Sequence, residues 1–385
     1  RLMCPNCGRV FVSEPTGRCP DDGGQLNALA GDNMVGQVVD GKYRILEVVG
    51  AGGMSLVYKA QHLMLNRIVA LKMLHGYLRG DDLSVKRFQQ EARTCASFDH
   101  PNVVPILDFG VTTSGQPFLV MKYLDGKSLT QMLRVQQRLH WTEALPIFIQ
   151  ACDALEAAHG AGIIHRDIKP GNIVVVREPD GSERVQVVDF GIAKMLNDDG
   201  ESQHLTQTGE VFGSPLYMSP EQCKGQPLDA RSDIYALGAV IYETLSGEPP
   251  LIGSSATETM LLHAHTVPPQ FAKVAAGLSL PEGLESVVQK MLAKAPAARF
   301  DSMAIVRQEL INIMGAGAFL EPPAPRRFLS SRRAVKVLVA LAFLLPAFAL
   351  VLLQGMPMLR SYRLERMMLQ SEQQMSDSRP GEAID

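Results

Sequence analysis

The feature that most limits the fold of this sequence is an ordered series of glycine-rich and polar motifs between residues 43 and 314. The first is the glycine-rich segment 50–57, which follows the strand-like, β-branched run 43–49. Glycines let a backbone turn tightly and bring its N–H groups close to phosphate oxygens. Because glycine-rich turns also occur as plain hairpins, this motif alone leaves phosphate binding and a structural turn both open.

A single lysine, Lys72, ends the next apolar strand, 69–72. Such a lysine can hold an ammonium group against phosphates. In the following segment, Glu91 lies beside a stripe of residues at helical spacing, Val85, Phe88, Ala92 and Cys95. Either Lys72 extends from a core strand and Glu91 lies on a solvated face, or Glu91 pairs with Lys72 and fixes its head group. The order and spacing of the two residues favour the pair.

The decisive stretch is His-Arg-Asp-Ile-Lys-Pro-Gly-Asn at 165–172, followed by Asp-Phe-Gly at 189–191 and Ser-Pro-Glu at 219–221. Together with the earlier motifs, it resembles the protein kinase family over residues 43–312. More narrowly, it resembles the bacterial eukaryotic-like serine/threonine kinases. The resemblance implies an α+β fold of two lobes, with a β-rich small lobe at 43–121, a helical large lobe at 126–312 and the nucleotide between them.

The resemblance implies four catalytic residues. Phosphoryl transfer needs a hydroxyl in line with the γ-phosphate and neutralisation of the charge on the transferred group. In such kinases Asp167 accepts or orients the proton of the substrate hydroxyl, and Lys169 contacts the transferred phosphate. Lys169 is also typical of serine/threonine rather than tyrosine specificity. Lys72, held by Glu91, binds the α- and β-phosphates.

The cofactors implied are ATP and Mg²⁺. Asn172 and Asp189 are the expected Mg²⁺ ligands, because a small divalent cation prefers hard oxygen donors. In the glycine-rich loop Ser55 replaces the third glycine, and Lys122 replaces the usual acidic residue at the start of the hinge, yet the catalytic set is complete. The residues expected to contact the nucleotide are Gly50, Ala51, Gly52, Gly53, Met54, Ser55, Val57, Ala70, Lys72, Met121, Lys122, Leu124 and Val174.

Other motif residues are expected to support the site rather than react. His165 and Phe190 should pack in the core, Asp233 should brace the catalytic loop, and Arg299 should pair with Glu221.

Regulation is expected to depend on Arg166, because an arginine beside the catalytic aspartate can bind a phosphate on the activation segment. Thr206 and Thr208 are the predicted autophosphorylation sites, and the alternative is that they are two solvated threonines on a mobile loop. Ser214 is expected to position the substrate.

Two cysteine pairs near the N-terminus resemble zinc-ribbon knuckles within residues 1–30. Cys4 and Cys7 form a C-x-x-C pair, and Cys19 and Asp22 form a C-x-x-D pair. A structural zinc takes four ligands in a tetrahedron, and Asp22 is a poorer fourth ligand than cysteine. A redox-active C-x-x-C and a metal-free loop remain open as alternatives.

The C-terminal part contains a candidate membrane span. A proline-bearing linker at 315–331 leads to 337–359, which contains 23 residues without charge. As a helix these residues reach roughly 35 Å, enough for a hydrocarbon core of about 30 Å. Flanking arginines and lysine favour a cytoplasmic N-terminal side, with a short tail at 360–385. The alternative is a buried C-terminal helix of the globular domain.

The expected function is ATP-dependent phosphorylation of serine and threonine hydroxyls in proteins, by a kinase tethered to the inner membrane through one span. Autophosphorylation in trans would need a homodimer. The formal charge of −3 gives no basic field for nucleic acid. One alternative is a pseudokinase receptor or scaffold that binds nucleotide and recruits partners. A small-molecule kinase is disfavoured by the Ser-Pro-Glu motif and the long activation segment.

Overall fold

The computed structural model describes residues 34–52, 55–74, 82–190, 214–275 and 277–318, and the short pieces 2–3, 10–11, 17–18 and 27–28. The chain divides into two units, Arg1–Leu320 and Glu321–Asp385, and all of the second unit lies outside the described residues. No helix within the described ranges has the length and apolar character needed to cross a bilayer. The predicted features that lie outside the description are Cys4, Cys7, Cys19, Asp22, Gly53, Met54, Thr206, Thr208, the apolar run 337–359 and the tail 360–385.

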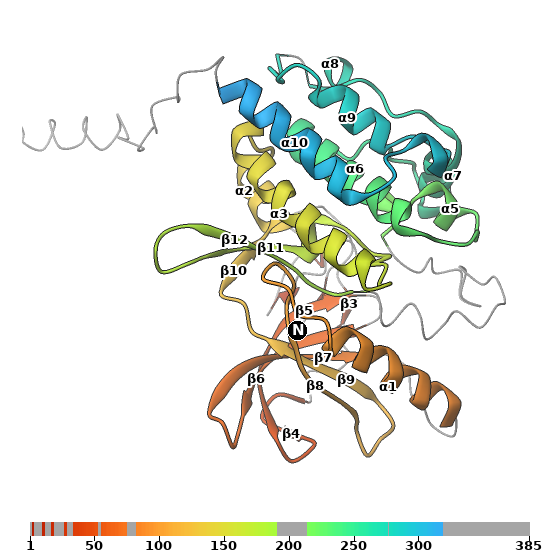
Figure 1. Ribbon diagram of the computed structural model, residues 1–385. Coiled ribbons are helices and arrows are strands. Elements are labelled where there is room, and N and C mark those ends of the chain that lie inside the picture. Colours follow the sequence, from red (N-terminus) through yellow and green to blue (C-terminus); the bar gives the residue numbers. More distant parts are fainter. Residues whose placement is uncertain are drawn as a thin grey trace, which may run out of the picture. The chain divides into compact units, whose positions relative to one another are not determined.

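The small lobe is a six-stranded antiparallel sheet with strand order β4-β5-β6-β7-β9-β8 (Figure 1). Buried and exposed side chains alternate at the start of β5, as a period of two residues requires when one face packs on a core, whereas residues 117–121 of β9 are all buried. Tyr43, Ile45, Tyr58 and Leu71 form the centre of that core. The strands are β4 (Val38–Val39), β5 (Tyr43–Gly52), β6 (Ser55–His62), β7 (Arg67–Leu74), β8 (Ile106–Val111) and β9 (Pro117–Lys122).

One helix, α1 (Asp82–Ala96), belongs to the small lobe and packs against β8. Phe88 and Ala92 are fully buried in a cluster with Leu74 and Leu119. This confirms the apolar stripe expected from the sequence, and it fixes which face of α1 meets the sheet.

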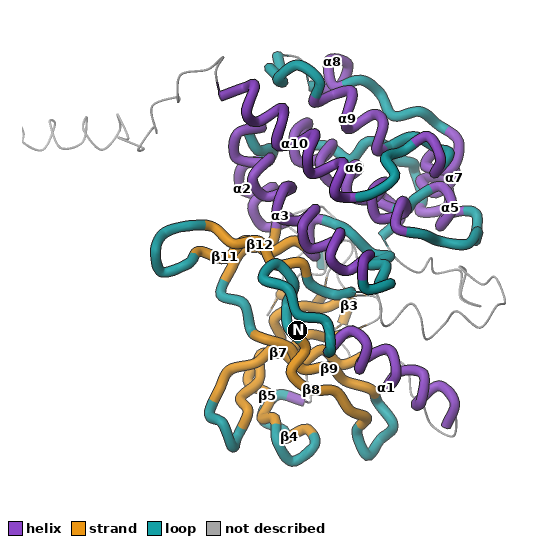
Figure 2. Tube along the Cα trace, viewed as in Figure 1, coloured by secondary structure: helices purple, strands orange, loops and turns teal. Residues whose placement is uncertain are grey.

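The large lobe is mainly helical, as Figure 2 shows in purple. Nearly every residue of α6 from Ser232 to Ser246 is buried, so this helix is the centre of the lobe. The helices are α2 (Leu129–Gln136), α3 (Trp141–Gly160), α5 (Pro220–Cys223), α6 (Ala230–Ser246), α7 (Ala256–His265), α8 (Phe271–Val274), α9 (Leu284–Met291) and α10 (Met303–Ala318). Helix α10 therefore extends into the segment 315–331 that the sequence predicts as a linker.

A small antiparallel sheet, β10-β11-β12, lies at the edge of the large lobe that faces the small lobe (Figure 1). Its strands are β10 (Gly126–Ser128), β11 (Ile173–Arg177) and β12 (Glu183–Val187). The segment after α1 joins this sheet through a bridge between Val103 and Val187. In addition, Asn102 donates its side-chain amide to the carbonyl of Val185 at 2.8 Å. The segment that follows α1 is therefore anchored to the large lobe.

Candidate active site

The loop 165–172 connects the end of α3 to β11 and brings three predicted residues into direct contact. The ammonium of Lys169 lies 2.9 Å from Oδ2 of Asp167. The side-chain amide of Asn172 donates to the backbone carbonyl of Asp167 at 2.8 Å and is 3.4 Å from its Oδ2. Two positions on one short loop therefore hold the carboxylate of Asp167 in a defined place.

Asp233, in the first turn of α6, holds the backbone of this loop. Its Oδ2 accepts the backbone N–H of His165 at 2.8 Å, and its Oδ1 accepts the N–H of Arg166 at 2.9 Å. The side chain of His159 on α3 also donates to Oδ2, at 2.7 Å. Burial alone would raise the pKa of Asp233, but these hydrogen bonds hold that pKa below its ordinary value. The expected bracing role is therefore confirmed, with His159 as an additional member.

His165 supports the loop through both nitrogens of its ring. Its Nε2 is 2.9 Å from the carbonyl of Val188, and its Nδ1 accepts the N–H of Asp167 at 3.3 Å. One nitrogen donates and the other accepts, which is the pattern of a neutral imidazole. Burial lowers the pKa of His165 and so keeps the ring neutral. The ring also packs on Phe190, with centroids 4.6 Å apart.

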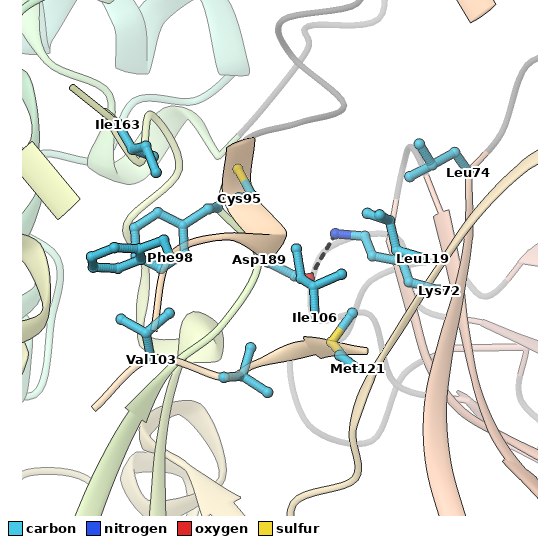
Figure 3. A pocket seen from close by; sticks show the side chains of 12 residues that line it. Lys72, Leu74, Cys95, Phe98, Val103, Ile106, Leu119, Met121, Ile163 and Asp189 are labelled. Carbon is cyan, nitrogen blue, oxygen red and sulfur yellow. Dashed lines mark ion pairs between the residues drawn. The ribbon is translucent and has the colours of Figure 1, made fainter. Parts of the chain in front are cut away.

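Lys72 of β7 and Asp189 form the contact that joins the two lobes at the site (Figure 3). The ammonium nitrogen lies 2.8 Å from Oδ1 of Asp189. Asp189 has a φ of +64°, so its backbone lies in the left-handed region that L side chains seldom adopt. Glu91 lies on α1, but its side chain is outside the description, so its pairing with Lys72 stays a prediction.

An apolar surface lies beside this ion pair. Ala70, Val104 and Met121 form a buried cluster, against which Val57 and Leu124 pack. Four residues expected to contact the nucleotide therefore meet at one place. Val174, a fifth, is half-buried on β11, opposite Ser128.

A pocket opens from the ion pair toward α1 (Figure 3). Met121, one of the residues expected to contact the nucleotide, lies on its wall. The lining also includes the apolar residues Cys95, Phe98, Val103, Ile106 and Leu119.

The charge state of Lys169 suits contact with an anion. Burial alone would lower its pKa, but the adjacent carboxylate of Asp167, and more weakly that of Asp189, raise it above the ordinary value. Lys169 therefore stays protonated throughout the physiological pH range.

The oxygen donors of the site fit the predicted Mg²⁺. Because Nδ2 of Asn172 is hydrogen bonded to Asp167, the amide is oriented and its remaining polar atom is an oxygen. Asp189 supplies a carboxylate, and both are hard donors of the kind that Mg²⁺ prefers. No cluster of three His, Cys, Asp or Glu side chains that could hold a metal occurs in the described part of the chain.

Glu221 and Arg299 form the buried ion pair that the motifs predict. Arg299 donates to both carboxylate oxygens, at 2.7 and 2.8 Å, and Ser232 donates to one of them at 2.7 Å. Burial opposes the charge on Glu221, but the hydrogen bonds from Arg299 and Ser232 hold its pKa below the ordinary value. This pair fixes the Ser-Pro-Glu segment to the large lobe.

Two residues near the loop have roles that the sequence analysis missed. His159 carries no local signal, because its partner Asp233 lies in another helix. Gln222 completes a capping box with Ser219 at the start of α5, and the pattern S-x-x-Q could have indicated that box. The side-chain amide of Gln222 also donates to the carbonyl of Arg166 at 2.8 Å. Nothing in the sequence indicates this contact with the catalytic loop.

Comparison with known proteins agrees with this geometry. The family described as protein kinase domain matches residues 43–311. Serine/threonine-protein kinase PknB of Mycolicibacterium smegmatis is 40% identical over 300 residues, covering 77% of this chain and 46% of the relative. Serine/threonine-protein kinase pkn3 of Myxococcus xanthus is 38% identical over 279 residues, covering 72% and 51%. The chain spans about half the length of these relatives.

A solved structure supports the fold independently. The crystal structure of the Mycobacterium tuberculosis PknI kinase domain aligns with a TM-score of 0.56 at 30% identity, covering 74% of this chain and 99% of that one. With the match over 43–311 and the catalytic geometry, this similarity establishes that the chain belongs to the protein kinase domain family.

Proposed function

We propose that the chain is a serine/threonine protein kinase, which transfers the γ-phosphate of ATP to serine and threonine hydroxyls of proteins. The observation that carries the proposal is the arrangement of charges at the junction of the lobes. Lys169 and Asn172 hold the carboxylate of Asp167. Lys72 contacts Asp189, which follows the catalytic loop in the chain. All members of the set needed for phosphoryl transfer are present, which favours an active enzyme over a pseudokinase.

Each residue of the set has a separate task. Asp167, oriented by Lys169, binds the hydroxyl of the substrate and takes its proton as the bond to phosphorus forms. Lys169 stabilises the negative charge of the group in transfer, and Lys72 binds the phosphates that remain on the nucleotide. Asn172 and Asp189 would hold Mg²⁺, which, when bound, supplies positive charge to the phosphate oxygens.

The proposal is tested by transfer of labelled γ-phosphate to a generic protein substrate. We expect Lys72→Met to lower transfer by about 100-fold or more, because the variant loses a positive charge at the phosphates. The matched control is Lys42→Met, directly before strand β5. Lys42 pairs with the exposed Asp40 at 2.9 Å and with Asp108 at 3.4 Å, so this variant should keep wild-type transfer. Transfer that is undetectable in the wild type would reject the proposal in favour of a pseudokinase.

We also propose regulation by autophosphorylation at Thr206 or Thr208. The supporting features are the sequence position of both threonines between Asp189 and Glu221, and an arginine, Arg166, directly before the catalytic aspartate. We expect mass spectrometry of active wild-type protein to find phosphate at one or both positions, and its absence in the Asp167→Asn variant. If two copies phosphorylate each other, the rate will rise with protein concentration. Active protein without phosphate at either threonine would exclude this regulation.

For the N-terminal segment we propose a zinc ribbon, with Cys4, Cys7, Cys19 and Asp22 as ligands. The segment contains three short paired strands, β1 (Leu2–Met3), β2 (Val10–Phe11) and β3 (Asn27–Ala28), in the order β2-β1-β3. In the sequence, each cysteine-bearing knuckle falls in one of the two connections. A segment of so few residues cannot easily bury enough apolar surface to fold by itself, which favours a bound metal that stabilises it. Metal analysis of purified protein should find stoichiometric zinc that Cys4→Ser removes; zinc-free, folded protein would exclude it.

We propose that 337–359 anchors the kinase in the inner membrane, with residues 43–312 in the cytoplasm. The support is the absence of charge over 23 residues and the basic residues on both sides. The protein should fractionate with membranes, and a variant lacking 337–359 should be released. Recovery of both in the soluble fraction would exclude the anchor.

A further inference from the structure

The peptide unit between Arg166 and Asp167 is held at both of its edges. On one edge, the N–H of Asp167 donates to Nδ1 of His165 at 3.3 Å. On the other edge, the carbonyl oxygen of Arg166 accepts a hydrogen bond of 2.8 Å from the side-chain amide of Gln222. Because this peptide directly precedes the carboxylate of Asp167, its orientation sets where that carboxylate points.

The same peptide is attached to a backbone under strain. Arg166 has a φ of +64°, a conformation that costs a non-glycine residue about 1–2 kcal/mol. Asp233 holds the N–H of Arg166, and Gln222 holds its C=O. Relaxation of φ at Arg166 toward negative values would move its carbonyl relative to its N–H, so the hydrogen bonds from Gln222 and to Asp233 together oppose that relaxation.

The amide of Gln222 is itself fixed in one orientation. Its Oε1 accepts the backbone N–H of Ser219 at 3.0 Å, and the hydroxyl of Ser219 accepts the N–H of Gln222 at 3.3 Å. Only one assignment of the amide oxygen and nitrogen satisfies both the N–H of Ser219 and the carbonyl of Arg166. The capping box of α5 is thus joined to the catalytic loop by a single side chain.

We propose that Gln222 is a positioning residue that couples the Ser-Pro-Glu end of the activation segment to the catalytic loop. Helix α5 follows in the chain the segment that contains Thr206 and Thr208, and the Glu221–Arg299 pair fixes α5 to the large lobe. When α5 is in place, Gln222 holds the Arg166–Asp167 peptide; when α5 moves away, the peptide loses one of its two restraints. This inference rests on the proposed kinase function, because one of its tests measures kcat for phosphate transfer.

The chain offers a matched control for this role. Helix α2 begins with the same motif, in which Gln131 accepts the N–H of Ser128 at 2.8 Å and Ser128 accepts the N–H of Gln131 at 3.3 Å. Gln131 is exposed and caps only its own helix. Replacing either glutamine by glutamate keeps the side-chain oxygen that accepts in the capping box. In Gln222→Glu, however, the amide group that donates to the carbonyl of Arg166 is also replaced by a carboxylate oxygen, which cannot donate.

The experiment compares Gln222→Glu with Gln131→Glu in the full chain. For Gln222→Glu we expect kcat to fall about tenfold or more. Its KM for ATP should stay within about twofold, because the nucleotide contacts are untouched. Hydrogen–deuterium exchange of the loop 165–172 should accelerate in Gln222→Glu and stay unchanged in Gln131→Glu. Gln131→Glu should keep wild-type kcat.

Two further measurements keep the outcome decisive. If Gln222→Glu fails to fold, Gln222→Met takes its place, with Gln131→Met as its control. Both methionine variants lose the acceptor of their capping box, but only Gln222→Met also loses a donor to the catalytic loop, and it must show the same loss of kcat and the same loop exchange. A kcat within about twofold of wild type, or unchanged exchange of the loop, overturns the coupling. If the wild type itself transfers no phosphate, the proposed function fails. Hydrogen–deuterium exchange of the loop 165–172 then still decides whether Gln222 restrains that loop.

Discussion

Replacing Asp167 by asparagine will lower kcat for phosphate transfer by about 10²–10⁴-fold, the usual contribution of a positioned general base. Asparagine has the same shape, so the hydrogen bond from Asn172 to the backbone carbonyl of residue 167 stays possible. What is lost is the negative charge that accepts the proton of the hydroxyl and orients Lys169. Binding of ATP should stay close to wild type, which can be measured by calorimetry alongside the transfer assay.

The control for this substitution is Asp153→Asn on α3. Asp153 forms an ion pair with Arg307 of α10 on the surface of the large lobe, so its loss removes the same charge far from the loop 165–172. We expect kcat within about twofold of wild type for this variant. Strong residual transfer by Asp167→Asn, in protein free of contaminating kinase, would contradict the role assigned to Asp167.

Replacing Arg299 by leucine will destabilise the protein by about 3–5 kcal/mol at neutral pH, since it leaves a buried charge without its partner. The side chains of Arg299 and Glu221 are almost completely inaccessible, and two hydrogen bonds join them. The hydrogen bond from Ser232 remains, but it cannot replace a guanidinium. Urea denaturation of the two proteins at pH 7.5 gives the difference.

The destabilisation should depend on pH with a defined sign. In the wild type the pKa of Glu221 is lowered, so its stabilising effect is present at neutral pH and is lost as the pH falls through the folded pKa. In Arg299→Leu the same buried carboxyl lacks its cation, so its pKa is raised by burial, and the variant loses stability as the pH rises. The difference between the two proteins should therefore be larger at pH 7.5 than at about pH 5.

Arg184→Leu provides the comparison for an exposed ion pair. Arg184 contacts Glu178 at 2.6 Å on the hairpin between β11 and β12, with both side chains substantially exposed. Such pairs contribute about 0–1 kcal/mol. An equal loss of stability in Arg184→Leu and Arg299→Leu would show that burial of the Glu221 pair contributes little.

The sequence predicted best those parts of the site that lie on one short segment. Asp167, Lys169 and Asn172 fall within six residues, and the loop brings them together as expected. The resemblance to protein kinases also indicated two distant supports correctly, since Asp233 braces the loop and Arg299 pairs with Glu221.

Contacts between segments that lie far apart in the chain could not be predicted in the same way. The structure places Lys72 against Asp189, a contact that the sequence analysis does not include, while the predicted pair of Lys72 with Glu91 lies outside the description. Which groups a lysine meets depends on the position of α1 and of the lobes, and residue spacing does not encode that position. The contact from Gln222 to Arg166 was missed for the same reason, because 56 residues separate a short-range capping motif from a carbonyl group.

The left-handed backbone at Arg166 and Asp189 has a consequence for protein engineering. Glycine at these positions would relieve about 1–2 kcal/mol each, so a directed-evolution experiment that selects only for heat resistance will be drawn to both. Such a selection would enrich robust proteins that have lost turnover, since Arg166 adjoins Asp167 and Asp189 contacts Lys72. Libraries built on this chain should therefore hold both codons fixed, or select for phosphate transfer in every round.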